Sequence, residues 1–200
     1  TDIFKLAFST LYAELVYLIA LEQDSEDATG IYTLLKENLF ALNDPPESLE
    51  QQFDKQLPVV LATHFQMALL QEIGYAPAVQ QCIVSGQMLD FSQPYYGFSP
   101  ELGGVVLRQH QQAVAGLIHE QEAEGDTRHS SGHGGDYASV VNVSTSTLKV
   151  LCDPLGSDWT TAQPVKVIKF LQYYLAYKLE KTVRAYDFVF QLLDSPVTSG

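Results

Sequence analysis

Apolar residues recur at helical spacing through the first 74 residues, and this pattern restricts the chain to a largely α-helical fold. It predicts one helix over residues 2–22, with Asp2 or Thr1 as the N-cap, and a second over residues 29–42. A third is predicted over residues 46–74, where Pro58 either kinks the helix or splits it in two. Three amphipathic helices in succession must pack on one another to cover their apolar faces.

Beyond these helices the helical signal weakens and then returns. Glycines and prolines punctuate residues 75–110, which we expect to form a small irregular insert of loops and short strands. Residues 121–136 contain almost no hydrophobic side chain, so we expect a mobile loop there. Ser144 or Ser146 can cap a short helix that follows. We therefore predict one mainly α domain over residues 1–200, a helical bundle with a small irregular or β insert.

The last predicted helix, from Pro164 to about Leu193, has two chemically different faces. At about 100° per residue, one face is an apolar core stripe made by Ile168, Leu171, Leu175, Leu179, Val183, Tyr186 and Phe190. The opposite face, within about 120° of arc, carries Lys166, Lys169, Tyr173, Tyr177, Lys181 and Arg184. Cations interleaved with aromatic rings can bind phosphates and stacked bases, or an acidic peptide with an aromatic anchor. The alternative is a solvated face over which the lysine stems extend.

The charge of the chain is strongly uneven. The 24 acidic and 11 basic residues give a net charge of −13, which repels phosphate at long range and argues against a general DNA-coating role. Residues 165–184, however, hold five basic side chains against Glu180 alone. This stretch therefore carries +4 and the remainder of the chain −17. The contrast favours a partner-binding role for the basic face over a merely solvated one.

Metal-binding and catalytic patterns are weak. His129 and His133 are four residues apart, but they lie in the predicted loop, where no helix would bring them together. The two cysteines, Cys82 and Cys152, are too few for a disulfide scaffold, so a reducing cytoplasm is the expected compartment. The sequence offers no nucleophile with a base, no glycine-rich phosphate loop and no paired carboxylates in an apolar setting, so we do not expect an enzyme.

The apolar runs are short. The longest, such as residues 15–21, fall well below the ~20 residues that a membrane span requires, and no secretory leader opens the chain. We therefore expect a soluble protein with no membrane partner. Because the chain begins at Thr1 and runs straight into a helical pattern, we also expect it to be a piece of a longer protein.

Two blocks in the middle of the chain carry a family resemblance. Residues 70–86 read LQEIGYAPAVQQCIVSG, and residues 103–110 read GGVVLRQH. They resemble the C-terminal region of the RecO family of bacterial recombination mediators, in which a helix ends in G-Y-x-P before a C-x-x-C-G knuckle and G-G-V-x-C-x-x-C supplies the second pair of zinc ligands. The segment LQYYLAYKLEKTVRAYDFV is similar to the final helix of that family.

The chain departs from the family at the zinc knuckle. The four ligand positions hold Cys82, Ser85, Leu107 and His110. Ser85 is a poor zinc ligand, and Leu107 cannot coordinate a metal. We therefore expect a degenerate knuckle without metal or any other cofactor, in which hydrophobic contacts take the place of the zinc.

The resemblance implies a non-enzymatic role in DNA repair. The family helps to load the recombinase RecA onto single strands coated by single-stranded-DNA-binding protein, partners RecR and promotes annealing. Its N-terminal OB-fold, which binds single strands, has no counterpart in these residues, so we expect this chain alone to bind single-stranded DNA weakly. Its helical region binds the acidic tail of single-stranded-DNA-binding protein, a role that the basic face suits. A helical adaptor with an unrelated partner is the competing hypothesis.

Overall fold

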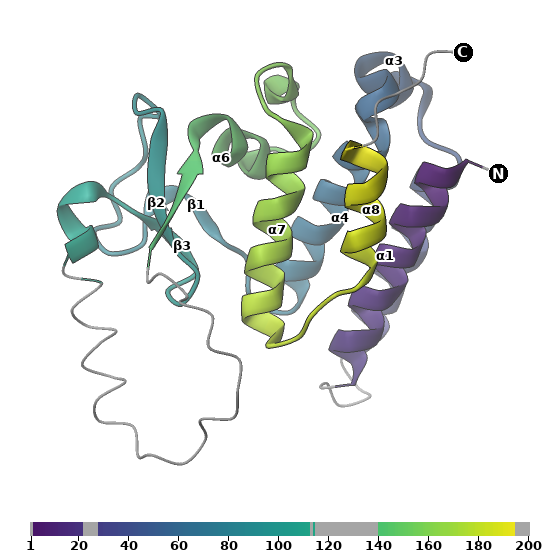
Figure 1. Ribbon diagram of the computed structural model, residues 1–200, viewed down its shortest axis with the longest axis horizontal. Helices are drawn as coiled ribbons and strands as arrows, with labels where there is room; N and C mark the ends of the chain where they lie inside the picture. The colour runs from purple at the N-terminus through teal and green to yellow at the C-terminus, as the bar shows by residue number, and fades with distance from the viewer. Residues whose placement is uncertain (1, 22–27, 113, 115–139, 195–200) are drawn as a thin grey trace.

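The computed structural model describes residues 2–21, 28–112, 114 and 140–194, and it is mainly α-helical with a small sheet, which confirms the predicted fold class. The helices are α1 (Ile3–Ala20), α2 (Ala28–Asn43), α3 (Glu47–Phe53), α4 (Leu57–Glu72), α6 (Thr145–Cys152), α7 (Pro164–Leu179) and α8 (Ala185–Asp194). The strands are β1 (Ala78–Cys82), β2 (Tyr95–Ser99), β3 (Gly104–Val106) and β4 (Val141–Ser144). Figure 1 shows the sheet at one end of the molecule, the body of α1, α4 and α8 at the other, and α7 between them.

The N-terminal helices form as the sequence pattern predicts. The side chain of Asp2 caps α1 by accepting a 2.9 Å hydrogen bond from the backbone N–H of Phe4. The predicted third helix is split into α3 and α4, and Pro58 stands in the first turn of α4, where its missing N–H leaves no hydrogen bond unmade. Gly74 follows the end of α4 with a φ of +77°, a conformation that glycine adopts without strain.

Helix α1 is at the centre of the helical body. Its length and composition would allow it to cross a membrane, but it packs against α2, α4 and α8, as the core helix of a folded domain does. Its Tyr12 ring stacks on Phe65 of α4 with a centroid distance of 4.1 Å. The fully buried side chains of α1 are Ala7, Phe8, Leu11, Tyr12 and Leu15.

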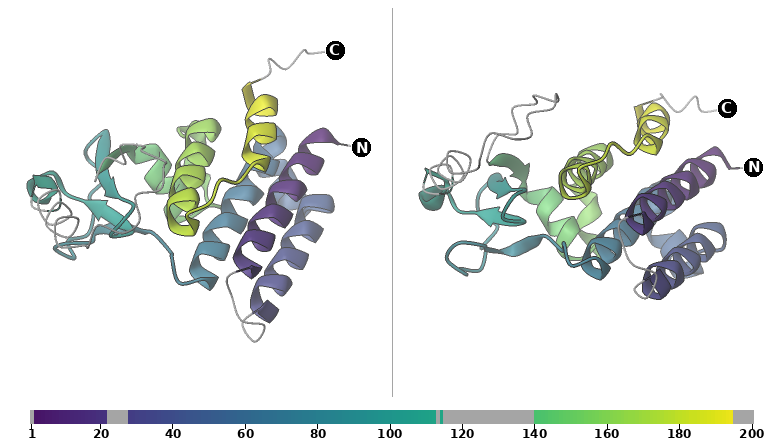
Figure 2. Two further views of the ribbon diagram at one scale, coloured as in Figure 1. Left: turned by 60° about the horizontal axis from the view of Figure 1, so that its bottom comes forward. Right: turned by 90° about the horizontal axis from the view of Figure 1, so that it is seen from below.

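The prediction of one continuous helix from Pro164 to Leu193 is wrong. Helix α7 ends at Leu179, and Glu180 takes a left-handed conformation with a φ of 50° before α8 begins. The physical reason lies in α1, where the Glu14 carboxylate accepts hydrogen bonds from the backbone N–H groups of Arg184 and Ala185. A new helix start capped in this way lets α8 turn away from the direction of α7 and pack along α1 (Figure 2). The side chains of the predicted core stripe are nevertheless buried on α7, on α8 and, at Val183, in the connection between them, and only Phe190 is partly exposed.

The small sheet has the strand order β1-β3-β2-β4, with β1 parallel to β3 and β2 antiparallel to both of its neighbours. Helix α7 covers one of its faces, where the Phe98 ring meets the rings of Phe170 and Tyr174 edge-on at 4.9 and 5.3 Å. Ser144, at the end of β4, caps α6 as predicted by accepting a hydrogen bond from Thr147 N–H. The predicted mobile loop at 121–136 lies outside the described residues.

Candidate functional site

Three residues of the predicted basic face line one groove between α7 and the edge of the sheet. Lys166, Lys169 and Tyr173 lie on the α7 side of this groove, which has a volume of about 350 Å³. The remaining lining residues are Tyr95, Val141, Asn142, Val143, Ser144, Thr147 and Phe170. We call this cavity the α7–β4 groove. Because the described lining residues include two lysines and no carboxylate, they make the groove electropositive in a chain of net charge −13.

The α7–β4 groove combines an apolar floor with a cationic rim. Val143 and Phe170 are buried, whereas Lys166 and Lys169 are exposed. The Lys169 ammonium lies 5.6 Å from the centroid of the Phe190 ring, a cation–π distance that orders the lysine at the rim. A ligand with both an apolar group and an anionic group fits this arrangement.

Among the described residues β4 is an edge strand of the sheet, so no described strand pairs with its second edge. Thr145 N–H donates a 3.0 Å hydrogen bond to the Pro94 carbonyl, in register with the β2–β4 pairing. Since hydrogen-bonded pairs alternate in an antiparallel ladder, Val141 and Val143 turn their backbone groups towards β2 and Asn142 turns its N–H and C=O away. An extended peptide can pair with such an edge.

The other three residues of the predicted face lie elsewhere. Tyr177 is half-buried further along α7, with the Lys178 ammonium 5.7 Å from its ring centroid. Lys181 and Arg184 come after the end of α7, in the connection to α8. From Lys166 to Lys181 is roughly 20 Å along the direction of α7. Lys166, Lys169, Tyr173 and Tyr177 therefore share helix α7, whereas Lys181 and Arg184 do not lie on it.

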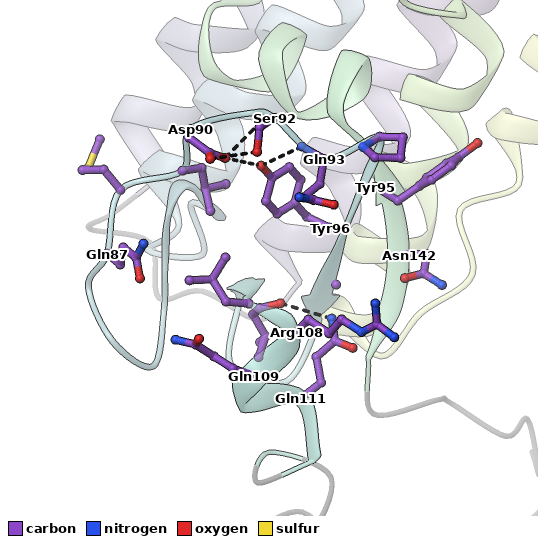
Figure 3. A pocket seen from close by; sticks show the side chains of 16 residues that line it. Gln87, Asp90, Ser92, Gln93, Tyr95, Tyr96, Arg108, Gln109, Gln111 and Asn142 are labelled. Atoms are coloured by element: carbon purple, nitrogen blue, oxygen red, sulfur yellow. Dashed lines mark hydrogen bonds between the residues drawn. The ribbon is translucent and has the colours of Figure 1, made fainter.

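A second cavity, of about 600 Å³, lies on the outer face of the sheet, and the sequence did not indicate it (Figure 3). The segment from Gln87 to Tyr96 forms one wall, and the segment from Val106 to Gln111 forms the other. Five carboxamide side chains line it: Gln87, Gln93, Gln109, Gln111 and Asn142. We call it the amide pocket. The only sequence signal for it was the local abundance of glutamine on both sides of β2.

Hydrogen bonds fix the wall of the amide pocket that contains Asp90. The Asp90 carboxylate accepts hydrogen bonds from the backbone N–H and the hydroxyl of Ser92, at 3.0 and 2.8 Å, and from the Tyr96 hydroxyl at 2.8 Å (Figure 3). The backbone and side-chain bonds from Ser92, together with the bond from Tyr96, lower the pKa of Asp90 to about 2. Asp90 is therefore ionised at neutral pH.

The opposite wall approaches β2 closely. Gln111 donates a hydrogen bond to the Val106 carbonyl at 3.3 Å and lies over Gly97. A β-carbon at Gly97 would overlap the Gln111 carboxamide and the Val140 side chain. The absence of a side chain at Gly97 therefore lets the Gln111 carboxamide approach the backbone of β2 and leaves space in the pocket above the strand.

The two halves of the predicted knuckle do meet. Leu107 N–H points at the Cys82 sulfur, 3.5 Å away, at the junction of β1 and the residues after β3. Burial raises the pKa of the Cys82 thiol, but hydrogen bonds from the Leu107 backbone and from the side chain and backbone of Ser85 outweigh it, and the pKa is lowered. This cradle of donors around sulfur resembles a metal knuckle in shape.

The donor set of the knuckle does not fit zinc. The Leu107 side chain has no donor atom and packs against the core, and the exposed Ser85 is a weak ligand. Only Cys82 and His110 remain, and His110 Nε2 lies 3.1 Å from the side-chain nitrogen of Gln109. Among the described residues, no three His, Cys, Asp or Glu side chains converge where they could hold a metal. His129 and His133 lie outside those residues.

The comparisons with known proteins rest on one family. No curated protein and no solved structure matches the chain. The model of the family described as "Recombination protein O C terminal" matches residues 1–122, which include the helices α1 to α4, the knuckle and three of the four strands. This match covers more than half of the chain. The chain therefore belongs to the recombination protein O family, and residues 1–122 correspond to the C-terminal region of that family.

Proposed function

We propose that this chain is the partner-binding region of a non-enzymatic, cytoplasmic recombination mediator, which aids RecA loading and annealing on single strands coated by single-stranded-DNA-binding protein. The family membership supports a role in recombination and repair. The observation that supports a partner-binding role is the α7–β4 groove, in which Lys166 and Lys169 lie beside the buried Phe170. The ligand that fits it is the acidic, aromatic-ended tail of single-stranded-DNA-binding protein.

The chemistry of the groove suits such a tail in three ways. The apolar residue of the tail can pack on Phe170 and Val143, and its carboxylates can meet Lys166 and Lys169. The outward-facing backbone of Asn142 offers one donor and one acceptor to an extended chain. Charge-assisted contacts of this kind contribute about 1.5–3 kcal/mol each when partly desolvated, and far less on a fully wet surface.

The test compares two matched pairs of charge reversals. Lys166→Glu with Lys169→Glu should weaken binding of a labelled tail peptide at least about tenfold, the equivalent of ~1.4 kcal/mol. Lys181→Glu with Arg184→Glu makes the same change in net charge roughly 20 Å away along α7, so it should weaken binding much less. Both variants should unfold at nearly the wild-type temperature, because the four side chains are exposed or only partly buried.

The reverse result, a loss of binding only in the Lys181 and Arg184 variant, would move the tail to the connection between α7 and α8. Equal affinity in all three proteins would favour the competing hypothesis of a helical adaptor with an unrelated partner.

RecR and single-stranded DNA complete the proposed set of partners. With a net charge of −13, this chain alone should bind oligonucleotides weakly, and the binding should fall steeply with salt. Nanomolar binding of the isolated chain at physiological salt would contradict this division of labour, because it would leave no task for a separate OB-fold.

A further inference from the structure

The amide pocket has the composition of a site for a flat, polar ligand. Its five carboxamides each present a donor and an acceptor side by side, the pattern that pairs with the edge of a nucleobase. Met88, Leu89 and Leu107 supply apolar surface between them. Its volume of about 600 Å³ lies within the range of about 300–1,000 Å³ typical of small-molecule pockets.

One aromatic ring stands at the end of the amide pocket nearest β4. Tyr95 is 58% exposed, and it lies at this end near Asn142 with its ring directed outwards, away from Gln87 and Gln109 (Figure 3). Tyr95 is the first residue of β2, and its side chain is exposed whereas those of Tyr96 and Phe98, which point to the opposite face of the strand, are buried. An exposed tyrosine beside carboxamides is a stacking platform for a base.

The charges of the pocket select the ligand further. Arg108 is the only cation among the lining residues that the structure describes and is exposed, so its guanidinium can bind a phosphate. Asp90 is the only carboxylate among them, and it is held by Ser92 and Tyr96 in the wall. An acidic peptide entering the pocket would meet this ionised carboxylate, whereas a single nucleotide brings one negative charge to Arg108.

We infer that the amide pocket holds one unpaired nucleotide of a single strand, with its base against Tyr95, its polar edge on the carboxamides and its phosphate at Arg108. The inference deepens the proposed function and rests on it for the identity of the strand. Tyr95 and Asn142 line both this pocket and the α7–β4 groove, so the two cavities adjoin across the edge of β4. A strand that leaves the pocket over this edge reaches Lys166 and Lys169.

The experiment uses the 200-residue chain and a short single-stranded DNA that carries one iododeoxyuridine. Irradiation should cross-link this base to the peptide that contains Tyr95, identified by mass spectrometry. In anisotropy titrations at low salt, Tyr95→Ala should weaken binding about tenfold, whereas Tyr95→Phe, which keeps the ring, should bind like the wild type. Arg108→Gln should reduce the slope of log affinity against log salt by about 1. Tyr32→Ala removes a similarly exposed ring from α2 and should change nothing.

Two results would overturn the inference. If Tyr95→Ala and Arg108→Gln leave oligonucleotide binding unchanged while the Lys166 and Lys169 reversals weaken it, the strand follows α7 without entering the pocket. If Arg108→Gln, which changes the amide pocket and not the α7–β4 groove, weakens binding of the tail peptide and not of the oligonucleotide, the pocket is a peptide site. The proposal that the α7–β4 groove binds the tail peptide is tested separately: it stands if Lys166→Glu with Lys169→Glu weakens binding of the peptide, whatever the pocket variants do to the oligonucleotide.

Discussion

The carboxylate of Glu14, in α1, accepts a 2.6 Å hydrogen bond from the backbone N–H of Ala185, the first residue of α8. A second bond, from Arg184 N–H at 3.0 Å, makes Glu14 the cap of a helix that begins 171 residues later in the chain. Glu14→Ala should lower the free energy of unfolding by about 1–2 kcal/mol, because it leaves these N–H groups without their acceptor. Urea denaturation measures the change.

The control for this prediction is Glu37→Ala, on the exposed surface of α2, which should change stability by less than ~0.5 kcal/mol. Glu14→Gln keeps an acceptor oxygen and should fall between the wild type and Glu14→Ala. If Glu14→Ala and Glu37→Ala had equal effects, the cap would contribute nothing to the position of α8.

Two buried tyrosines should respond in opposite ways to loss of the hydroxyl. The Tyr12 hydroxyl finds no hydrogen-bond partner among the described residues, so Tyr12→Phe should raise the free energy of unfolding by about 1 kcal/mol. The Tyr186 hydroxyl donates to the side-chain carbonyl oxygen of Gln66, and Tyr186→Phe should lower it by about 1–3 kcal/mol because that buried oxygen loses its donor. Thermal denaturation of the two variants gives the comparison, and destabilisation by Tyr12→Phe would contradict it.

The wild-type chain should contain no stoichiometric zinc, since Cys82 and His110 are the only strong ligands at the knuckle. Ser85→Cys with Leu107→Cys should create a site that binds about one zinc per chain, because it restores two thiolates at the knuckle, whose two halves already meet where the Leu107 backbone N–H lies 3.5 Å from the Cys82 sulfur. Elemental analysis after stringent chelation tests both proteins. His110→Ala in the double variant should weaken its zinc binding, and zinc retained by the wild type would show that the ligand set has been misassigned.

The Asp90 network should make a small, pH-dependent contribution to stability. Its pKa of about 2 in the folded chain lies below the ordinary value of 3.8, so the contribution is present above about pH 4 and is lost as the pH falls towards 2. The difference in melting temperature between wild type and Asp90→Asn should therefore shrink across this window. A difference that stays constant down to pH 2 would mean that the ionised carboxylate is not what orders the wall of the amide pocket.

The helices could be predicted from the sequence because each one carries its own apolar period and its own signals for ends. Asp2, Pro58 and Ser144 act at the helix starts where the pattern placed them. The break at Glu180 could not be predicted in this way. No glycine or proline marks it, and Val183 and Tyr186 continue the apolar period of α7, while the residue that stabilises the break, Glu14, belongs to another helix.

The candidate sites were predictable only in part. Lys166, Lys169 and Tyr173 share a helix, so their common face could be inferred from spacing alone. The far side of the groove is β4, whose pairing with β2 joins segments more than 40 residues apart, and no local pattern specifies such a pairing. The amide pocket depends on the same pairing and on the absence of a side chain at Gly97. Its glutamines come from separate segments, so nothing in the sequence shows that they line one pocket.

The contact between α1 and α8 has a consequence for how the domain is made. Helix α8 covers the first helix of the chain, through hydrogen bonds that span 170 and 171 residues. During synthesis, α1 leaves the ribosome long before α8 exists, so it can pack on α2 and α4 well before it meets α8. The contact between α1 and α8 can form only after translation has passed Asp194, and until then the surface that α8 will cover is open to chaperones and to other nascent chains.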